Sequence, residues 1–525
     1  MKSGSISLSQ RRPSMCKTIS PIDHMLLPRS RQKETRRPSS ALGDTGLSTL
    51  GLGASQRGSE HPGMTGIDLL DDGLDAFAIR KVLLEFAERS IDLQYYIWHD
   101  DLTGNLMLEQ VRAAAARGVR VRLLLDDNGI AGLDDVLRWM ADLPNIEIRV
   151  FNPFRSRRLK PLDFLFRFRR ANRRMHSKSF TVDNQVTIVG GRNIGDEYFA
   201  AKREGMFADL DAVCIGPVVQ EVSDCFDRFW NSPLAVPIDA LVPEVAETRA
   251  QKLETRIRRL TGGTQSISYG KQVEEGSLLG CIGRGEIELT WAPVQLVSDP
   301  PEKVLAARET GGPLLDALTG IIGEPTKELL IVSAYFVPTK NGANALGEMA
   351  QRGVDVRVLT NSYASTDVGA VHAGYAKHRK LLIQAGVQLF EVPAPDDEPK
   401  TARKFVRTGS RERDESPGST LHAKAYSVDG TRLFVGSLNF DPRSFSLNTE
   451  LGIVIDNVAL AKQMRQSFDD TIARNTYRLV LDSNELGWID TRDDDPVIER
   501  IEPGTTFFSR IAVRALERLP IDWLL

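Results

Sequence analysis

From about residue 66 onward, apolar positions follow first a helical period and then a strand period, and this alternation continues along the chain. Amphipathic helices that alternate with short apolar strands are typical of an α/β layered fold. The predicted elements are a helix at 74–90, a strand at 91–97, a helix at 105–117 and a strand at 120–126, then a helix at 313–322, a strand at 328–335, a helix at 341–351 and a strand at 355–359.

The same order of elements occurs in both halves of the chain, and short phrases repeat with it. Arg-Gly-Val-x-Val-Arg stands at 117–122 and again at 352–357, in each case between a predicted helix and a predicted strand. A repeated phrase at a repeated place in the pattern indicates that the chain is an internal duplication. We therefore expect two similar halves.

A second repeat carries side chains that can do chemistry. The spacing His-x-Lys-x4-Asp begins at His176 and again at His422, and each copy is followed at the same distance by a Gly-Gly or Gly-Ser pair and an asparagine. One such motif is weak support for a site, but two copies with the same trailing residues are hard to explain by chance. The repeated residues are His176, Lys178, Asp183 and Asn193 in the first copy, and His422, Lys424, Asp429 and Asn439 in the second.

Within each motif, the alternation of His176 with Lys178 and of His422 with Lys424 predicts a strand that presents both side chains on one face. Asp183 and Asp429 fall where the strand turns, because Asp-Asn and Asp-Gly are good turn dipeptides. Two histidines and two lysines supply an attacking group, a proton donor and cations, which together suit the cleavage of a phosphodiester.

At these residues the chain resembles the phospholipase D superfamily, and within it the bacterial cardiolipin synthases of the C type. The runs 93–98, 175–199 and 520–525 read like that subfamily, and the similarity covers about residues 66 to 525. The resemblance implies two tandem phospholipase D-like α/β/α halves, related by a pseudo-twofold axis, with one shared active site.

The resemblance also implies roles for the residues. His176 would attack phosphorus to form a phosphohistidine, and His422 would protonate the leaving alcohol and later take a proton from the acceptor. Lys178, Lys424, Asn193 and Asn439 would hold the phosphate oxygens, since fixed donors stabilise developing charge. Asp209 and Glu450 occupy the positions of the acids that orient the histidines, and Asp183 and Asp429 complete the motifs. No metal or other cofactor is expected.

Composition limits the possible partners. The net charge of −3 over 525 residues argues against a protein built to bind nucleic acid along its whole surface. The four cysteines show neither a disulfide framework nor zinc-ligand spacing. No stretch is apolar enough to span a bilayer, so any membrane contact should be peripheral. We expect attachment to the cytoplasmic (inner) membrane of a bacterium.

The chain divides into five predicted regions. Residues 1–65 should be a disordered basic extension and 236–310 an irregular linker, while a charged loop at 393–419 should lie near the site entrance. The remaining regions are the first half at 66–235, the second half at 311–475 and an amphipathic C-terminal segment at 476–525.

Two stretches favour a lipid surface without requiring one. Residues 155–174 hold nine basic side chains interleaved with aromatic residues, which suits an anionic membrane, single-stranded nucleic acid or a solvated loop. Residues 506–525 form a predicted amphipathic helix that could bind a bilayer or pack on the protein itself.

The leading hypothesis is a cardiolipin synthase that transfers a phosphatidyl group to phosphatidylglycerol, with phosphatidylethanolamine or phosphatidylglycerol as the donor. The alternatives are a phospholipase D that passes the group to water, a nuclease or phosphodiesterase of the same superfamily, and a scaffold without catalysis. A nuclease should show a steep dependence on salt. A scaffold should have lost part of its motifs, whereas both copies here are complete.

Overall fold

The structure is a computed structural model that describes residues 37–155, 157, 160–202, 206–276, 287–305, 313–366, 368–394, 419–493 and 495–517. The chain divides into two units, Met1–Arg37 and Pro38–Leu525, and all the elements below belong to the second unit. Residues 395–418 of the predicted loop at 393–419 and most of the predicted basic extension lie outside the described residues.

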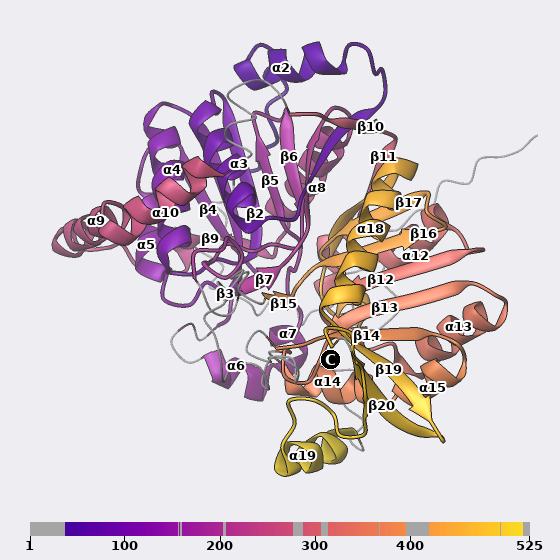
Figure 1. Cartoon of the computed structure of the whole chain (residues 1–525). Coiled ribbons are helices and arrows are strands. Elements are labelled where there is room, and N and C mark those ends of the chain that lie inside the picture. Colours follow the sequence, from indigo (N-terminus) through magenta and orange to yellow (C-terminus); the bar gives the residue numbers. More distant parts are fainter. Residues whose placement is uncertain are drawn as a thin grey trace, which may run out of the picture. The chain divides into compact units, whose positions relative to one another are not determined.

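The first half of the unit is built on a mixed sheet, which is nine-stranded among the described residues (Figure 1). Strands β2, β3 and β4 are parallel to one another, as expected for strands that alternate with helices. In spatial order the strands are β10 (Thr290–Ala292), β1 (Thr65–Leu70), β8 (Asp211–Ile215), β6 (Val186–Gly190), β5 (Ser179–Val182), β2 (Ser90–Ile97), β3 (Arg120–Gly129), β4 (Ile146–Phe151) and β9 (Ala235–Pro237).

The second half is built on another mixed sheet, which is ten-stranded among the described residues. A short ladder between β7 (Met206–Ala208) and β15 (Ser419–Leu421) joins the two halves. In spatial order the strands of the second sheet are β11 (Val294–Ser298), β18 (Leu451–Asp456), β17 (Arg432–Gly436), β16 (Lys424–Val428), β12 (Glu328–Ser333), β13 (Asp355–Asn361), β14 (Gln388–Val392), β19 (Tyr477–Asp482), β20 (Glu485–Asp490) and β21 (Ile498–Glu499).

Seven strands of one sheet match seven of the other in order and direction. The series β1-β8-β6-β5-β2-β3-β4 corresponds to β11-β18-β17-β16-β12-β13-β14, with β2 and β12 each parallel to the next strand and antiparallel to the motif strand. The predicted duplication is therefore confirmed at the level of topology, and so is the predicted fold class.

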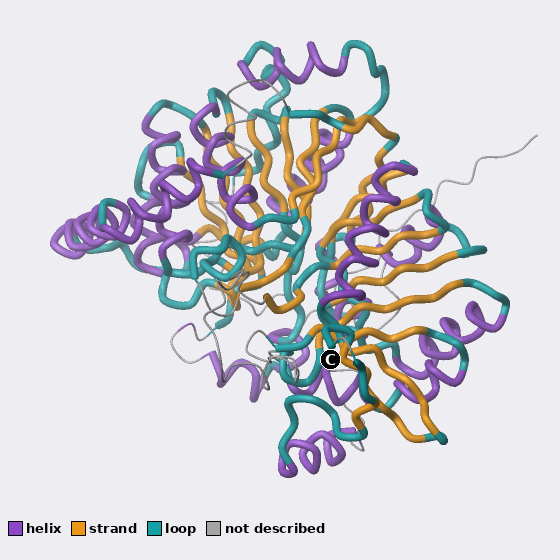
Figure 2. Tube along the Cα trace, in the orientation of Figure 1, coloured by secondary structure: helices purple, strands orange, loops and turns teal. Residues whose placement is uncertain are grey.

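Helices cover both faces of each sheet (Figure 2). Helices α3 and α4 pack on one face of the first sheet and α8 on the other, while α18 holds the corresponding inner place in the second half. Among the described residues, the α-helices are α2 (Thr49–Gly58), α3 (Gly73–Phe86), α4 (Leu102–Ala116), α5 (Asp134–Ala141), α6 (Lys160–Phe166), α7 (Phe168–Ala171), α8 (Val218–Trp230), α9 (Glu247–Thr261), α10 (Thr264–Glu275), α12 (Pro313–Ile322), α13 (Thr339–Gln351), α14 (Gly369–Ala376), α15 (Arg379–Gln384), α17 (Pro442–Ser446), α18 (Val458–Arg474) and α19 (Phe507–Glu517). The same residues include the 3-10 helices η3 (Ile238–Ala240) and η4 (Pro301–Leu305).

A shared apolar core joins the two halves. Buried side chains of α8, such as Phe229, lie in one cluster with Leu433 of β17 and Ile453 of β18. The outer faces of the two sheets have cores of their own. Because the middle core contains residues of both halves, the surfaces that carry the two motifs are held against each other.

The structure departs from the predicted regions in three places. Part of the predicted extension is ordered, since α2 begins at a capping Ser48 and β1 begins at Thr65. Residues 236–310 contain α9 and α10, and they also supply β10 to the first sheet and β11 to the second. The segment after residue 475 is more than a helix, because it adds β19, β20 and β21 to the second sheet.

Candidate active site

The two motifs enter their sheets at the boundary between the halves. His176 lies just before β5, and Met175 forms a parallel bridge with Thr449 of the other half. His422 lies between β15 and β16, and β15 pairs with β7 of the other half. Each histidine therefore precedes the motif strand that was predicted to contain it, on a segment that crosses to the opposite half.

Each histidine is held by the half to which it does not belong. The backbone N–H of His176 donates to the carbonyl of Thr449 at 2.9 Å, and its Nδ1 lies 2.8 Å from Oε2 of Glu450. Reciprocally, the N–H of His422 donates to the carbonyl of Ala208 at 2.8 Å, and its Nδ1 lies 2.5 Å from Oδ2 of Asp209. This mutual exchange is the contact pattern of a twofold axis.

A carboxylate on Nδ1 fixes the orientation of each ring and leaves Nε2 for substrate. The prediction paired Asp209 and Glu450 with the histidines as orienting residues, and the structure places both carboxylates at the histidine of the other half. Their catalytic effect stays a prediction.

The surroundings of the two carboxylates differ in one position. A Cβ on Gly191 would approach Oδ1 of Asp209 to 2.1 Å, so only glycine fits beside this carboxylate. The corresponding residue of the second motif is Ser437, whose hydroxyl donates to Oε2 of Glu450 at 2.5 Å. The Gly-Gly and Gly-Ser pairs of the sequence thus accommodate an aspartate on one side and a glutamate on the other.

Both lysines are buried beside their histidines. Lys178 Nζ donates to the carbonyl of His176 at 2.7 Å, and Lys424 Nζ donates to the carbonyl of His422. Lys424 Nζ also lies 3.0 Å from Nδ1 of His422. Burial lowers the pKa of Lys178 to about 7, since a charge is costly away from water unless an anion neutralises it. An anionic phosphate would supply that neutralising charge.

The pair of His176 with Glu450 differs electrostatically from the pair of His422 with Asp209. Burial, reinforced by the charges of Lys178 and Lys424, holds the pKa of His176 well below its usual value. Its partner Glu450 has a pKa raised by burial to about 7. Burial also lowers the pKa of His422, but the charge of Asp209 opposes this effect. The neutral form of His176 is thus favoured more strongly, and that is the form a nucleophile needs.

Asp209 itself stays ionised. Burial alone would raise its pKa, but the charges and hydrogen bond of His422, together with Lys424 and Arg192, lower the pKa below the ordinary value of an aspartate. Arg192 is fully buried and donates to the carbonyl of Asp209 at 2.7 Å. An ionised carboxylate on Nδ1 stabilises the protonated form of His422, which is the form that a general acid needs.

The two motif asparagines have different surroundings. Oδ1 of Asn193 accepts from the N–H of Ile97 at 3.2 Å, and its Nδ2 donates to the hydroxyl of Tyr198 at 2.9 Å. The Tyr198 ring in turn lies 5.2 Å from the ring of His422. Asn439 is buried, and its Oδ1 has no hydrogen-bond partner among the described residues. Phosphate binding by either asparagine stays a prediction.

Asp183 and Asp429 are not brought into the histidine cluster. Asp183 lies at the far end of β5, where its carboxylate accepts from the N–H groups of Arg89 at 2.7 Å and Ser90 at 2.9 Å. Asp429 accepts from the N–H groups of Lys327 at 2.7 Å and Glu328 at 3.0 Å. Because a strand rises by about 3.3 Å per residue, each aspartate is roughly 15 Å or more along the strand from its histidine.

Both aspartates also form the predicted turns. Asp183 and Asn184 have φ of 51° and 50°, and Asp429 and Gly430 have φ of 53° and 63°. Two consecutive residues with positive φ are typical of the tight turn that joins hairpin strands. The geometry accounts for the motif aspartates as residues that join strands, and their place among the catalytic residues stays a prediction.

Aromatic rings and one arginine complete the site, and the sequence reasoning assigned them no role. The ring of Tyr96 lies 5.0 Å from His176, and the ring of Phe207 lies 5.0 Å from His422. Arg443 donates to the side chain and carbonyl of Asn172, and its charge is one of those that lower the pKa of His176. Its position four residues after the motif asparagine is a signal that the repeat itself could have provided.

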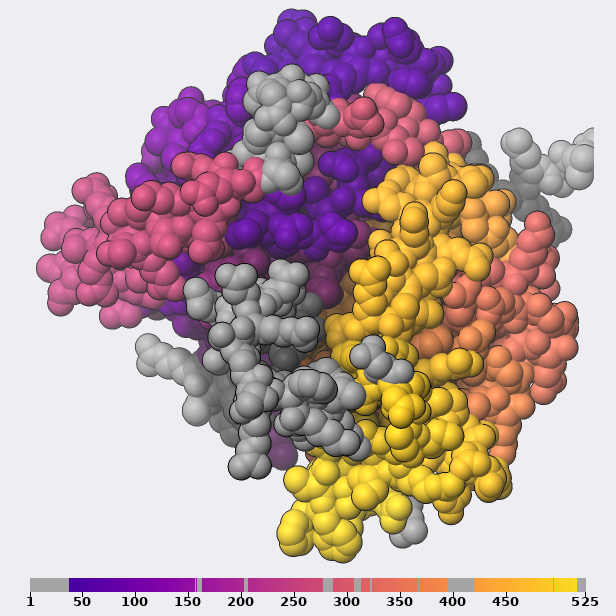
Figure 3. Space-filling view, viewed as in Figure 1, coloured from indigo at the N-terminus to yellow at the C-terminus, as the bar shows by residue number. Residues whose placement is uncertain are grey.

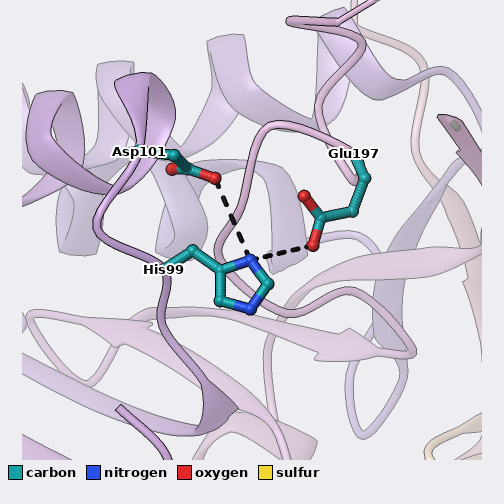
Figure 4. Close-up of side chains that lie close together, drawn as sticks. All are labelled: His99, Asp101 and Glu197. Atoms are coloured by element: carbon teal, nitrogen blue, oxygen red, sulfur yellow. Dashed lines mark ion pairs between the residues drawn. The ribbon is translucent and has the colours of Figure 1, made fainter. Parts of the chain in front are cut away.

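The equivalent position in the first half holds an acid. Glu197 stands four residues after Asn193, and its Oε1 lies 3.0 Å from Nδ1 of His99, which Oδ2 of Asp101 approaches to 4.0 Å (Figure 4). The group has the side chains of a metal site, but the oxygens of Asp101 already accept from the N–H groups of Gly104 and Asp196. These contacts cap α4 and join the loops around it.

Two tandem α/β halves and one shared pair of His–Lys motifs define a phospholipase D-like protein. The comparison with family models is more specific: the model described as "Cardiolipin synthase, PLD-like domain" matches residues 81–230 and 318–472. The chain belongs to this family of cardiolipin synthases.

Known proteins support the same conclusion. The chain is 42% identical over 468 residues to cardiolipin synthase C of Escherichia coli K12, and the aligned residues cover 89% of this chain and 98% of that protein. It is 24% identical to a cardiolipin synthase of Oceanobacillus iheyensis, over 80% of this chain and 72% of that protein. The family is one of phosphatidyltransferases, so the protein is an enzyme of this class.

A solved structure shares the fold. The crystal structure of phosphatidylserine synthase from Haemophilus influenzae matches with a TM-score of 0.52 at 16% identity, over 81% of this chain and 91% of that one. At this identity the likeness concerns the arrangement of strands and helices alone.

Proposed function

We propose that the protein is a cardiolipin synthase that transfers a phosphatidyl group to phosphatidylglycerol, with phosphatidylethanolamine or phosphatidylglycerol as the donor. The observation that carries the proposal is the crossed pairing of His176 with Glu450 and of His422 with Asp209. It gives one site two histidines in different protonation environments, which is what a two-step transfer needs.

In the first step, Nε2 of His176 attacks the phosphorus of the donor. The P–N bond forms while the bond from phosphorus to the headgroup oxygen breaks, and Nε2–H of His422 gives its proton to that oxygen. Lys178 and Lys424 stabilise the charge on the nonbridging oxygens. The products are a phosphatidyl-His176 intermediate and a free alcohol.

In the second step, His422 takes a proton from a glycerol hydroxyl of phosphatidylglycerol. That oxygen attacks phosphorus, the P–N bond breaks and His176 is released, with cardiolipin as the product. The same intermediate attacked by water would give phosphatidic acid, so exclusion of water decides between synthase and hydrolase. Of the described site residues, both histidines are less than a tenth exposed.

The proposed membrane contact is peripheral, on the cytoplasmic (inner) membrane of a bacterium. Among the described residues, no helix is both long and apolar enough to cross a bilayer. Helix α19 buries Val513 and exposes Phe507 and Phe508, beside Arg510 and Arg514, and α6 exposes Leu165 and Phe166. Exposed aromatic residues beside basic ones suit an anionic lipid surface.

The deciding experiment is mass spectrometry of lipids after incubation of the purified protein with phosphatidylglycerol vesicles, with and without phosphatidylethanolamine. Cardiolipin that depends on active protein would support the synthase, and release of ethanolamine would name the donor. The His176→Ala and His422→Ala variants should each be inactive. Phosphatidic acid without cardiolipin, or no lipid change, would overturn the proposal.

A further inference from the structure

A cavity of about 340 Å³ lies behind the second motif, between α18 and the first half. Figure 3 shows orange-yellow α18 running beside the indigo part of the first half, and the cavity lies where these surfaces meet. Leu210, Val332, Leu359 and Leu421 contribute to its walls, and polar side chains of α18 also line it. Its size and apolar walls are those of a ligand site.

Because the two halves are repeats, the residues of α18 that line the cavity can be matched with residues of α8 in the first half. Asp227 on α8 pairs with Arg122 at 2.8 Å, and Asp469 on α18 pairs with Arg357 at 2.7 Å. The two arginines are equivalent residues of the repeated phrase, and each aspartate follows a phenylalanine that packs on its arginine. Helices α8 and α18 can therefore be compared residue by residue from this point.

Two aromatic residues fill the first half where the second half is hollow. Phe229, two residues after Asp227, is fully buried, and its ring lies 5.6 Å from that of Phe151. Phe229 corresponds to Thr471, which lies two residues after Asp469. Phe151 corresponds to Val392, because these two residues end the equivalent strands β4 and β14. Both Thr471 and Val392 line the cavity. The cavity thus exists because the second half has two smaller side chains where the first half has two phenylalanines.

One wall of the cavity belongs to the catalytic machinery. Ala208 and Asp209 line it, and these are the residues that bond the backbone and Nδ1 of His422. Ala423, which follows His422, lines it as well. Because neighbouring strand residues face opposite sides, the cavity lies on the face of the motif strand away from the His422 ring.

We infer that this cavity binds one acyl chain of a zwitterionic phospholipid, separate from the lipid that reacts at His176. The inference rests on the proposed function, which places the enzyme among phospholipids. Charge selects the headgroup: among the described lining residues, the charged ones are Asp71 and Asp209, both acidic. Asp209 is already paired with His422, so it is exposed Asp71 that repels the carboxylate of a free fatty acid and favours a headgroup that carries an ammonium.

A bound chain would support the wall that positions His422. With the cavity filled, Ala208 and Asp209 would be packed on both sides, at the density of a protein interior. The second histidine would then be best ordered when the enzyme is among zwitterionic lipids.

The test is photo-crosslinking with vesicles that contain a phosphatidylcholine bearing a diazirine near the end of one acyl chain. Thr471→Phe should fill the cavity as Phe229 does in the first half, and Ser467→Leu should narrow it from the same helix. Gln466→Phe adds the same ring to an exposed position of α18 outside the lining and serves as the control. Thermal unfolding verifies that each variant is folded.

We expect cross-linked peptides from α18 and 419–425 in the wild type, at least tenfold less in Thr471→Phe or Ser467→Leu, and no change in Gln466→Phe. A diazirine fatty acid should label these peptides more weakly than the phospholipid. Labelling that persists in both Thr471→Phe and Ser467→Leu would overturn the inference. So would labelling found only on peptides outside the cavity, or stronger labelling by the fatty acid than by the phospholipid. Cross-linking is read on the protein, so it is independent of whether cardiolipin forms.

Discussion

Asp209 and His422 are 213 residues apart in the chain, yet Oδ2 of the first lies 2.5 Å from Nδ1 of the second. Glu450 has the same relationship to His176, over 274 residues. Each half thus supplies the histidine of one pair and the carboxylate of the other, so neither half holds a complete pair.

The first prediction concerns Asp209→Asn. The amide keeps the size of the side chain but removes the charge that stabilises protonated His422, and it permits the wrong tautomer of the ring. We expect a loss of about 10²- to 10⁴-fold in the single-turnover rate, by analogy with the aspartate of a serine-protease triad. Asp224→Asn, on the exposed face of α8, is the matched control. A loss below tenfold would contradict the orienting role.

The second prediction separates folding from catalysis at Asp183. Asp183→Ala removes the acceptor for several backbone N–H groups at the start of β2, which should cost roughly 2–4 kcal/mol of unfolding free energy. The turnover number of the folded protein should change little. Denaturant unfolding and active-site titration measure the two effects. A fully folded variant that is a hundredfold slower would show that the aspartate is catalytic after all.

The third prediction is a pH profile with both limbs near neutrality. Above pH 7 the rate should fall because Lys178, whose pKa burial lowers to about 7, loses its charge. Below pH 7 it should fall because Glu450, whose pKa burial raises to about 7, takes up a proton and no longer accepts from His176. The values of kcat/KM report these free-enzyme groups.

Bound substrate should move one limb of that profile. The anionic phosphate stabilises protonated Lys178, so the alkaline limb of kcat should lie at higher pH than that of kcat/KM. Rates over about pH 5 to 9, at low and at saturating lipid, test this difference. Identical alkaline limbs would mean that Lys178 does not contact the phosphate.

The fourth prediction concerns α19. Replacing Phe507 and Phe508, which are 65% and 80% exposed, by aspartate should weaken binding to anionic vesicles by about tenfold or more, since burial of each ring contributes about 1.5 kcal/mol or more. Val458→Asp, at a 62% exposed apolar residue of α18, is the control. Cosedimentation measures binding, and equal binding of all the proteins would exclude α19 from the membrane surface.

The sequence predicted those features that depend on local pattern or on the repeat. The strand at 91–97 and the helix at 105–117 appear as β2 and α4 with small shifts at their ends, because their apolar spacing is regular. The repeat indicated two similar halves, and the family resemblance implied that they share one site. The fold class and the family were likewise predicted correctly.

Elements with few buried residues escaped prediction. Helix α9 buries only Leu253 and Ile257 among its residues, so it lacks a broad apolar stripe, although glutamate, arginine and lysine favour a helix. Helix α2 contains three glycines and begins at the Ser48 cap, and tertiary packing stabilises it. The crossing of partners between the halves is likewise a tertiary contact, which no local pattern contains.

The crossed pairs also have a consequence for the life of the chain before it is complete. A polypeptide emerges from the ribosome with its N-terminus first, so His176 is exposed long before Glu450 has been synthesised. Until then its ring lacks the carboxylate that orients it. We therefore expect the nascent chain to be inactive until the segment around Glu450 has folded against the first half.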